Sequence, residues 1–186
     1  LVIGNADYAE GALRNPVNDA NLIAQTLDSL NFDVILGINL KNAEEMKNKI
    51  REFGNRRDDY NVALVYYAGH AIEIKGENFL LPTETAFESE EDVEDYAVSI
   101  QKILRYIDDK SNEVNILILD ACRDNPFEIK WDQTRSLSGN GLAKIEPPSG
   151  TLIAYSTAPG ETAADGSGDN SIYCQSLVKN FLLINE

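Results

Sequence analysis

The chain has 186 residues, 43% of them hydrophobic, and a formal net charge of −15. This length favours one globular domain with a substantial core over two domains. The acidic charge argues against binding to nucleic acids or anionic membranes and favours basic ligands. No apolar run reaches the roughly 20 residues of a membrane helix, and no signal peptide is visible.

The chain begins at Leu1 without a methionine, so we expect a domain taken from a longer protein. Its two cysteines and single histidine show no zinc-ligand spacing, and we expect no metal. Nothing else suggests a disulfide-stapled secreted scaffold, so we expect free thiols and favour a cytoplasmic location.

The first half of the chain alternates short apolar runs with helical patterns. A strand opens the sequence, and a helix should begin at Pro16 with Asn15 as its cap, because apolar residues then recur at helical spacing. The elements expected are a strand over residues 1–3, this first helix, a strand over 32–36, an amphipathic helix over 43–53 and a strand over 62–67.

The second half continues this alternation after a small hairpin over residues 71–82, where apolar and polar residues alternate around a Lys-Gly turn. The acidic run over 88–95 is expected to be a solvated loop or a helix start, with a cation site as the weaker alternative. The elements expected next are a helix capped by Ser99, a strand over 114–119, an unpatterned segment over 124–149, a strand over 151–156 and a helix over 172–183.

This order of elements predicts an α/β sandwich, with a mostly parallel central sheet and helices on both faces. Ligands of such sheets bind beyond the carboxyl ends of the strands. His70, the run Asp120-Ala121-Cys122 and the loop after Ser156 would all lie at that edge.

The histidine and one cysteine each follow a predicted central strand, and His70 precedes Cys122 by 52 positions. An imidazole beside a thiol lowers the pKa of the thiol and can protonate a leaving amine. We therefore predict a catalytic dyad of Cys122 and His70, with the backbone N–H groups of Gly69 and Cys122 facing an oxyanion. Taken singly, each residue could be inert packing; their coincidence favours the dyad.

Three stretches together carry a more specific resemblance: Tyr66-Tyr67-Ala68-Gly69-His70, Asn78-Phe79-Leu80-Leu81-Pro82 and Leu117-Ile118-Leu119-Asp120-Ala121-Cys122-Arg123. In this order they resemble the caspase-like cysteine peptidases, most closely paracaspases and bacterial caspase homologues. The resemblance covers nearly the whole chain and implies a single caspase-like domain. Its parts would be a large-subunit-like part over 1–123, a linker over 124–149 and a small-subunit-like part, expected to be truncated, over 150–186.

The resemblance implies hydrolysis of peptide bonds through an acyl-enzyme on Cys122, without a cofactor. Asp120 stands where aspartate-cutting caspases have glutamine, and the run around Asp19 resembles the segment that places a second carboxylate in the specificity pocket. Two carboxylates can bind a guanidinium in bidentate fashion, so we expect substrates cleaved after arginine, with lysine second. Asp19 could instead stabilise its helix start, and Asp120 could form a turn.

The remaining site residues are also assigned through the resemblance. Glu161 is a candidate third acidic group, and Tyr155 and Ser156 resemble the edge that pairs with an extended substrate. Arg135 would be a processing site in the linker. The family's dimer-forming sixth strand has no match after the last predicted helix, which argues against a homodimer, and the calcium ligands of metacaspases are not matched.

Three other readings compete with a peptidase. A catalytically silent caspase-like scaffold should lack the dyad, whereas both residues are present. A thiol phosphatase would need an arginine where Glu128 stands. A flavodoxin-like or receiver domain would use Asp120 but leave His70 and Cys122 unexplained, and it lacks a Gly-rich phosphate fingerprint.

Overall fold

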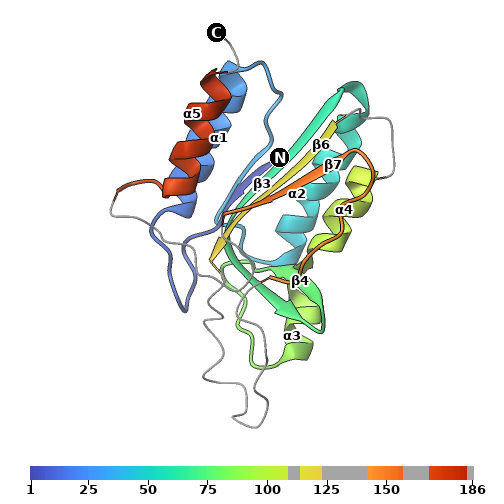
Figure 1. The fold of residues 1–186 in the computed structure, drawn as a ribbon. Helices are drawn as coiled ribbons and strands as arrows, with labels where there is room; N and C mark the ends of the chain where they lie inside the picture. Colours follow the sequence, from blue (N-terminus) through green and yellow to red (C-terminus); the bar gives the residue numbers. More distant parts are fainter. Residues whose placement is uncertain (109–113, 123–141, 157–167, 184–186) are drawn as a thin grey trace.

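A computed structural model describes residues 1–108, 114–122, 142–156 and 168–183 (Figure 1). The elements, in chain order, are β1 (Val2–Gly4), α1 (Pro16–Ser29), β2 (Leu36–Ile38), α2 (Ala43–Arg56), the short 3-10 helix η1 (Arg57–Asp59), β3 (Val62–Ile74), β4 (Glu77–Leu80), α3 (Glu90–Tyr96), β5 (Val98–Ser99), α4 (Ile100–Asp108), β6 (Val114–Cys122), β7 (Thr151–Tyr155) and α5 (Ile172–Leu183).

The sheet has a parallel part in the order β2-β1-β3-β6-β7, to which β4 and β5 add antiparallel strands through the far end of β3. Helices α1 and α5 lie side by side on one face, and α2 and α4 lie on the other (Figure 1). This arrangement confirms the predicted α/β sandwich with a mostly parallel sheet. Parallel strands covered on both faces explain the uninterrupted apolar runs.

Each face of the sheet has its own apolar core. The helices contribute side chains at helical spacing, which places one stripe of each helix against the strands. The core under α2 and α4 includes Met46, Ile50, Phe53, Ile100, Ile103, Leu104 and Ile107, and the core under α1 and α5 includes Ala20, Ile23, Leu27 and Cys174.

The contact between α1 and the sheet is unusually close at Gly4. A Cβ atom at this position would lie 2.4 Å from the Pro16 carbonyl oxygen and 2.5 Å from the Ala20 Cβ atom. Glycine therefore lets the start of α1 rest directly on β1. Because Asp19 belongs to this first helical turn, the same contact fixes its position near the end of the strands.

The long strand β3 corrects the prediction that the strand ends at residue 67, before His70. The strand runs through His70 to Ile74, because antiparallel pairing with β4 takes over from Ala71 where pairing with β6 ends at His70. β6 likewise continues to Cys122. The predicted hairpin is confirmed as the end of β3 and β4.

The prediction of a strand over 32–36 has the wrong bounds, since β2 comprises Leu36–Ile38 and begins only at the last predicted residue. The chain leaves α1 through Asn31 in a left-handed conformation, with φ of 64°. Phe32 and Val34 then pack against the core under α1 instead of pairing in the sheet. Apolar packing without ladder pairing gave the segment its strand-like pattern.

Other boundaries follow the patterns more closely. α2 extends one turn beyond the predicted 43–53, to Arg56. The acidic run contains a helix start, as expected: Ser89 and Asp92 form a capping box at the beginning of α3. Such reciprocal hydrogen bonds satisfy the first N–H groups of a helix.

The end of the predicted linker is anchored to the domain. The Asn78 side chain donates to the Ala143 carbonyl (2.8 Å) and accepts from the Ala143 N–H (2.7 Å). Leu142 and Ile145 are buried in the core under α2 and α4. Residues 142–148 are therefore part of the packed structure, although their sequence lacks a pattern.

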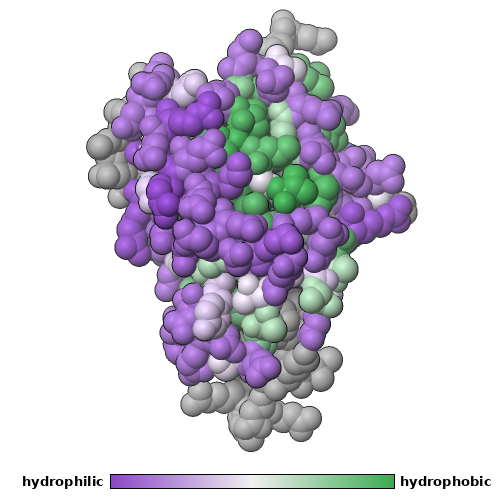
Figure 2. Space-filling model, turned by 180° about the vertical axis from the view of Figure 1, so that it is seen from behind, coloured by the Kyte–Doolittle hydropathy of each residue, from purple (hydrophilic) through white to green (hydrophobic). Residues whose placement is uncertain are grey.

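A cavity of about 240 Å³ lies at the amino-terminal ends of β1 and β3, away from His70. Its lining includes apolar side chains of α1 and α2, and none of the predicted site residues. Figure 2 shows apolar atoms gathered on one face and framed by hydrophilic ones. Within the described ranges, no helix is long and apolar enough to cross a membrane.

Candidate active site

The two residues predicted to form a dyad are neighbours across the sheet. β3 and β6 pair in parallel register from Val62 opposite Val114 to His70 opposite Cys122. Adjacent strands lie about 4.8 Å apart. Cys122 is described through its backbone alone, so the structure establishes the adjacency of the two positions.

His70 is 4% exposed, and one nitrogen of its imidazole is held by a backbone carbonyl. Nε2 lies 2.6 Å from the Gly11 oxygen. A carbonyl oxygen can only accept, so Nε2 carries the proton and the lone pair of the neutral ring is on Nδ1. The Tyr8 ring packs against the imidazole, with centroids 4.5 Å apart.

Two tyrosines hold the backbone of His70. Its N–H donates to the Tyr8 hydroxyl (2.9 Å), and its carbonyl accepts from the Tyr67 hydroxyl (2.7 Å). Gly69 has φ of 153°, and a Cβ atom there would lie 2.6 Å from the Tyr8 oxygen and 2.8 Å from the Tyr67 oxygen. Only glycine fits between the two hydroxyls without displacing them.

The two predicted specificity carboxylates come together although they lie on α1 and β6. Asp19 is 2% exposed and accepts from the Asn170 Nδ2 atom (2.8 Å) and the Ser171 N–H (3.0 Å). Asp120 is 8% exposed, and its Oδ2 atom accepts from the Tyr66 hydroxyl (3.0 Å) and the Ser171 hydroxyl (2.8 Å). Ser171 thus contacts both carboxylates.

The charge of each carboxylate raises the pKa of an acidic group beside it. Burial raises the pKa of Asp120 and the charge of Asp19 adds to this, while hydrogen bonds from Ser171 and Tyr66 lower it. Burial, followed by the charge of Asp120, raises the pKa of Tyr173 to about 12. No lysine or arginine in the described ranges forms an ion pair with either carboxylate.

Of the remaining predicted site residues, the structure describes Tyr155 and Ser156. Tyr155 ends β7, and the Ser156 N–H donates to the Leu119 carbonyl (3.0 Å). In the described part of the chain β7 pairs with β6 alone, so its outer edge has no strand partner. Glu161 and Arg135 lie outside the described residues, as does much of the predicted linker.

Sequence reasoning missed several residues that shape the site. Tyr8 and Gly11 lie in a segment without periodicity, and nothing in the sequence points to them. Tyr66 and Tyr67 carried a signal, because a tyrosine hydroxyl in a buried strand needs a polar partner. Ser171 carried another, because it precedes a predicted helix as a capping serine does.

Comparison with known proteins gives two kinds of match. A family model described as "Caspase domain" matches residues 1–183. The human (Homo sapiens) mucosa-associated lymphoid tissue lymphoma translocation protein 1 is 32% identical over 166 residues, covering 88% of this chain and 19% of that protein. The homologous mouse (Mus musculus) protein is also 32% identical over 166 residues, covering 18% of its length. The chain therefore spans about a fifth of these relatives.

Proposed function

The chain belongs to the caspase-domain family of cysteine peptidases, and from that premise we propose that it cleaves peptide bonds after arginine, and less readily after lysine, using Cys122 and His70. The observation that carries the specificity is the pair of buried carboxylates, Asp19 and Asp120, without a described cationic partner. The partner is then a peptide or protein with a basic residue before the scissile bond.

The dyad is supported by the register of β3 and β6 and by the hydrogen bond of the imidazole. With Nε2 donating to Gly11, Nδ1 is the ring nitrogen that would take the thiol proton of Cys122. The thiolate attacks the carbonyl carbon, and the C–S bond forms. The imidazolium then protonates the leaving amine as the C–N bond breaks, and water hydrolyses the acyl-enzyme with His70 as the base.

The specificity argument rests on charge. Two carboxylates in a water-poor site have a high energy unless a cation accompanies them. A guanidinium presents paired donors in a plane and can contact both carboxylates, whereas an ammonium is a compact point charge. This difference favours arginine over lysine, and the net charge of −15 attracts basic segments.

Two further roles extend the proposal to the substrate backbone. The backbone N–H groups of Gly69 and Cys122 would stabilise the oxyanion. The outer edge of β7, including Tyr155, with Ser156 next to it, would pair with an extended peptide. Both roles follow from the position of these residues beside the end of β6.

A panel of fluorogenic peptides that differ only before the scissile bond tests the proposal. Arginine, lysine, citrulline and aspartate are compared, since citrulline keeps the shape of arginine without its charge. We expect arginine to be preferred, then lysine, with citrulline and aspartate near background. Cys122→Ala should reduce the turnover at least about 1,000-fold.

The panel also separates the alternatives. A preference for aspartate would contradict the pocket and leave the dyad intact. Equal cleavage after arginine and citrulline would show that the positive charge of the substrate side chain does not determine specificity. Activity that survives Cys122→Ala would rule out the dyad, and absence of activity on every peptide would favour a silent scaffold.

A further inference from the structure

We propose that Ser171 is a positioning residue that holds Asp19 and Asp120 together as one guanidinium-binding pair. The inference rests on the proposed arginine specificity and adds to it a residue that the dyad and the two carboxylates do not include. Ser171 immediately precedes α5 and is 6% exposed.

Ser171 bridges two carboxylates that come from distant parts of the chain. Its N–H donates to both oxygens of Asp19, at 3.0 Å to Oδ1 and 3.3 Å to Oδ2. Its hydroxyl donates to Oδ2 of Asp120 at 2.8 Å. Since the N–H and the hydroxyl belong to one residue, the relative position of the two carboxylates depends on it.

The direction of the hydroxyl bond is fixed by a third contact. The N–H of Cys174 donates to the Ser171 oxygen at 3.0 Å, as in a helix N-cap. A hydroxyl has a single proton, and the oxygen that accepts from Cys174 uses that proton toward Asp120. The start of α5 therefore orients the serine, and the serine orients Asp120.

The bridge also favours the charged form of Asp120. Burial and the charge of Asp19 raise the pKa of Asp120, and the hydrogen bond from Ser171 is the strongest influence that lowers it. The groups that face Asp120 are Asp19 from α1, Tyr66 from β3, and Tyr173 and Cys174 from α5. None of these groups is a cation, and the charge of Asp19 raises the pKa of Asp120, so the donor from Ser171 offsets this repulsion before a substrate cation arrives.

The expected signature differs between arginine and lysine. Ser171→Ala keeps the N–H bond to Asp19 but removes the bond to Asp120. A guanidinium that needs both carboxylates should lose about tenfold in kcat/KM, mainly through KM, whereas an ammonium can use one carboxylate and should lose less. The acid limb of the kcat/KM profile should move to higher pH, because Asp120 loses the hydrogen bond that favours its charged form.

The experiment compares the wild type with Ser171→Ala, Ser171→Thr and Ser176→Ala on arginine and lysine peptides across pH, together with thermal unfolding. Ser176 is an exposed serine within α5, the helix that Ser171 precedes, and serves as the control. We expect a lower arginine-to-lysine ratio and a shifted acid limb in Ser171→Ala alone, with recovery in Ser171→Thr. If Ser171→Ala does not fold, Ser171→Cys, which keeps the size but donates weakly, should show the same changes.

The outcomes distinguish this inference from the proposed function. A wild type that cleaves after arginine, with Ser171→Ala matching Ser176→Ala in both readouts, would overturn the role of Ser171 and leave the function standing. An equal loss on both peptides with lower thermal stability and an unmoved acid limb would reduce Ser171 to a structural cap. A wild type without a preference for basic residues would overturn the function itself.

Discussion

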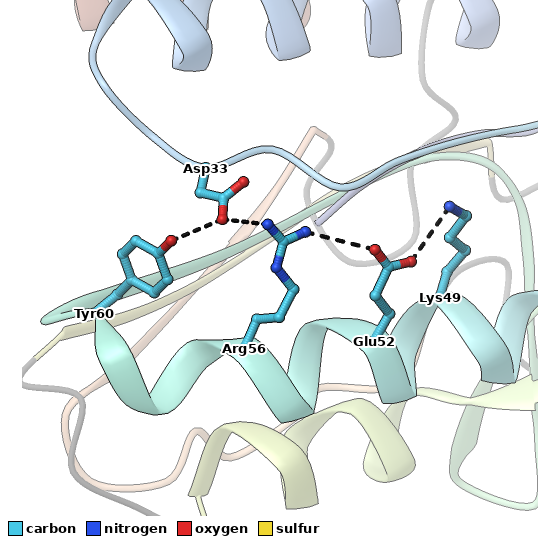
Figure 3. A network of polar contacts seen from close by, with 5 residues as sticks. All are labelled: Asp33, Lys49, Glu52, Arg56 and Tyr60. Carbon is cyan, nitrogen blue, oxygen red and sulfur yellow. Dashed lines mark hydrogen bonds and ion pairs between the residues drawn. The ribbon is translucent and has the colours of Figure 1, made fainter.

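At one end of the sheet the Oδ2 atom of Asp33 accepts from the Arg56 guanidinium (2.5 Å) and the Tyr60 hydroxyl (2.7 Å), as Figure 3 shows. At the other end the Oδ2 atom of Asp120 accepts from a tyrosine and a serine hydroxyl instead. Both carboxylates thus have a tyrosine donor and a second donor. The second donor is a cation in one case and a neutral hydroxyl in the other.

In the first arrangement positive and negative charges balance, and the side chains are exposed. From Arg56 the network continues to Glu52 and then to Lys49, with each ion pair at 3.5 Å, so that charges alternate along α2. These four charged side chains are 34–46% exposed. Exposed ion pairs contribute about 0–1 kcal/mol each, because water solvates their charges in the unfolded chain equally well.

The second arrangement is buried, and among the described residues it contains no cation. Asp19 and Asp120 share neutral donors, and burial raises the pKa of Asp120. A fold that served stability alone would pair such groups with cations or replace them by apolar residues. Their retention in this state is the pattern expected where a ligand brings the cation.

The largest expected effect follows from neutralising the unbalanced pair. Asp120→Asn or Asp19→Asn should lower kcat/KM for arginine peptides about 100-fold or more, as for other buried charge contacts. Thermal stability should be kept or raised, because a buried like-charge repulsion disappears. Steady-state kinetics and thermal unfolding of the same preparations measure both.

Asp95→Asn is the matched control, since it removes one negative charge from an exposed position of α3. It should leave kcat/KM nearly unchanged. An equal loss in the control and in Asp120→Asn would mean that net charge, and not the pair, attracts the substrate. A large loss of stability in Asp120→Asn would assign the carboxylate a structural role.

A smaller effect concerns pH and stability. The folded pKa of Asp120 is raised above its ordinary value of 3.8, so the folded state binds the proton more tightly than the unfolded state. The resulting stabilisation is complete below the unfolded pKa and is lost as pH rises through the folded pKa. Asp120→Asn does not titrate there, so its advantage over the wild type should grow as pH rises through this window. Urea unfolding at several pH values measures it, and an advantage that shrinks with rising pH would contradict the raised pKa.

Sequence patterns predicted the individual helices and those features of the site that follow from general rules of parallel sheets. Periodicity identified α1, α2, α4 and α5, and the rule that strand ends share an edge placed His70 beside Cys122. The family resemblance nominated Asp19 and Asp120 as a pair, and in the structure both carboxylates accept hydrogen bonds from Ser171. Rules of this kind need no knowledge of individual contacts.

Contacts between distant segments were beyond these rules. Ser171 is 152 positions from Asp19, and Tyr8 is 62 positions from His70. Their roles depend on how α5 and the segment after β1 pack, which no local pattern encodes. The length of β3 was also missed. Its end, from Ala71 onward, is stabilised by antiparallel pairing with β4, and the apolar run before His70 does not predict this pairing.

The smallest expected effect lies in the balanced network. Asp33→Asn should weaken the ion pair with Arg56, and a double-mutant cycle with Arg56→Ala should give a coupling of about 0.2–1 kcal/mol in urea unfolding. The coupling should decrease in high salt, because these charges are exposed and therefore screened. Peptidase activity should be unchanged, since the network lies at the end of the sheet away from His70. If Asp33→Asn reduced arginine cleavage as much as Asp120→Asn does, the two ends of the sheet would be coupled. Asp33, although paired with Arg56, would then matter for substrate cleavage as much as Asp120 does.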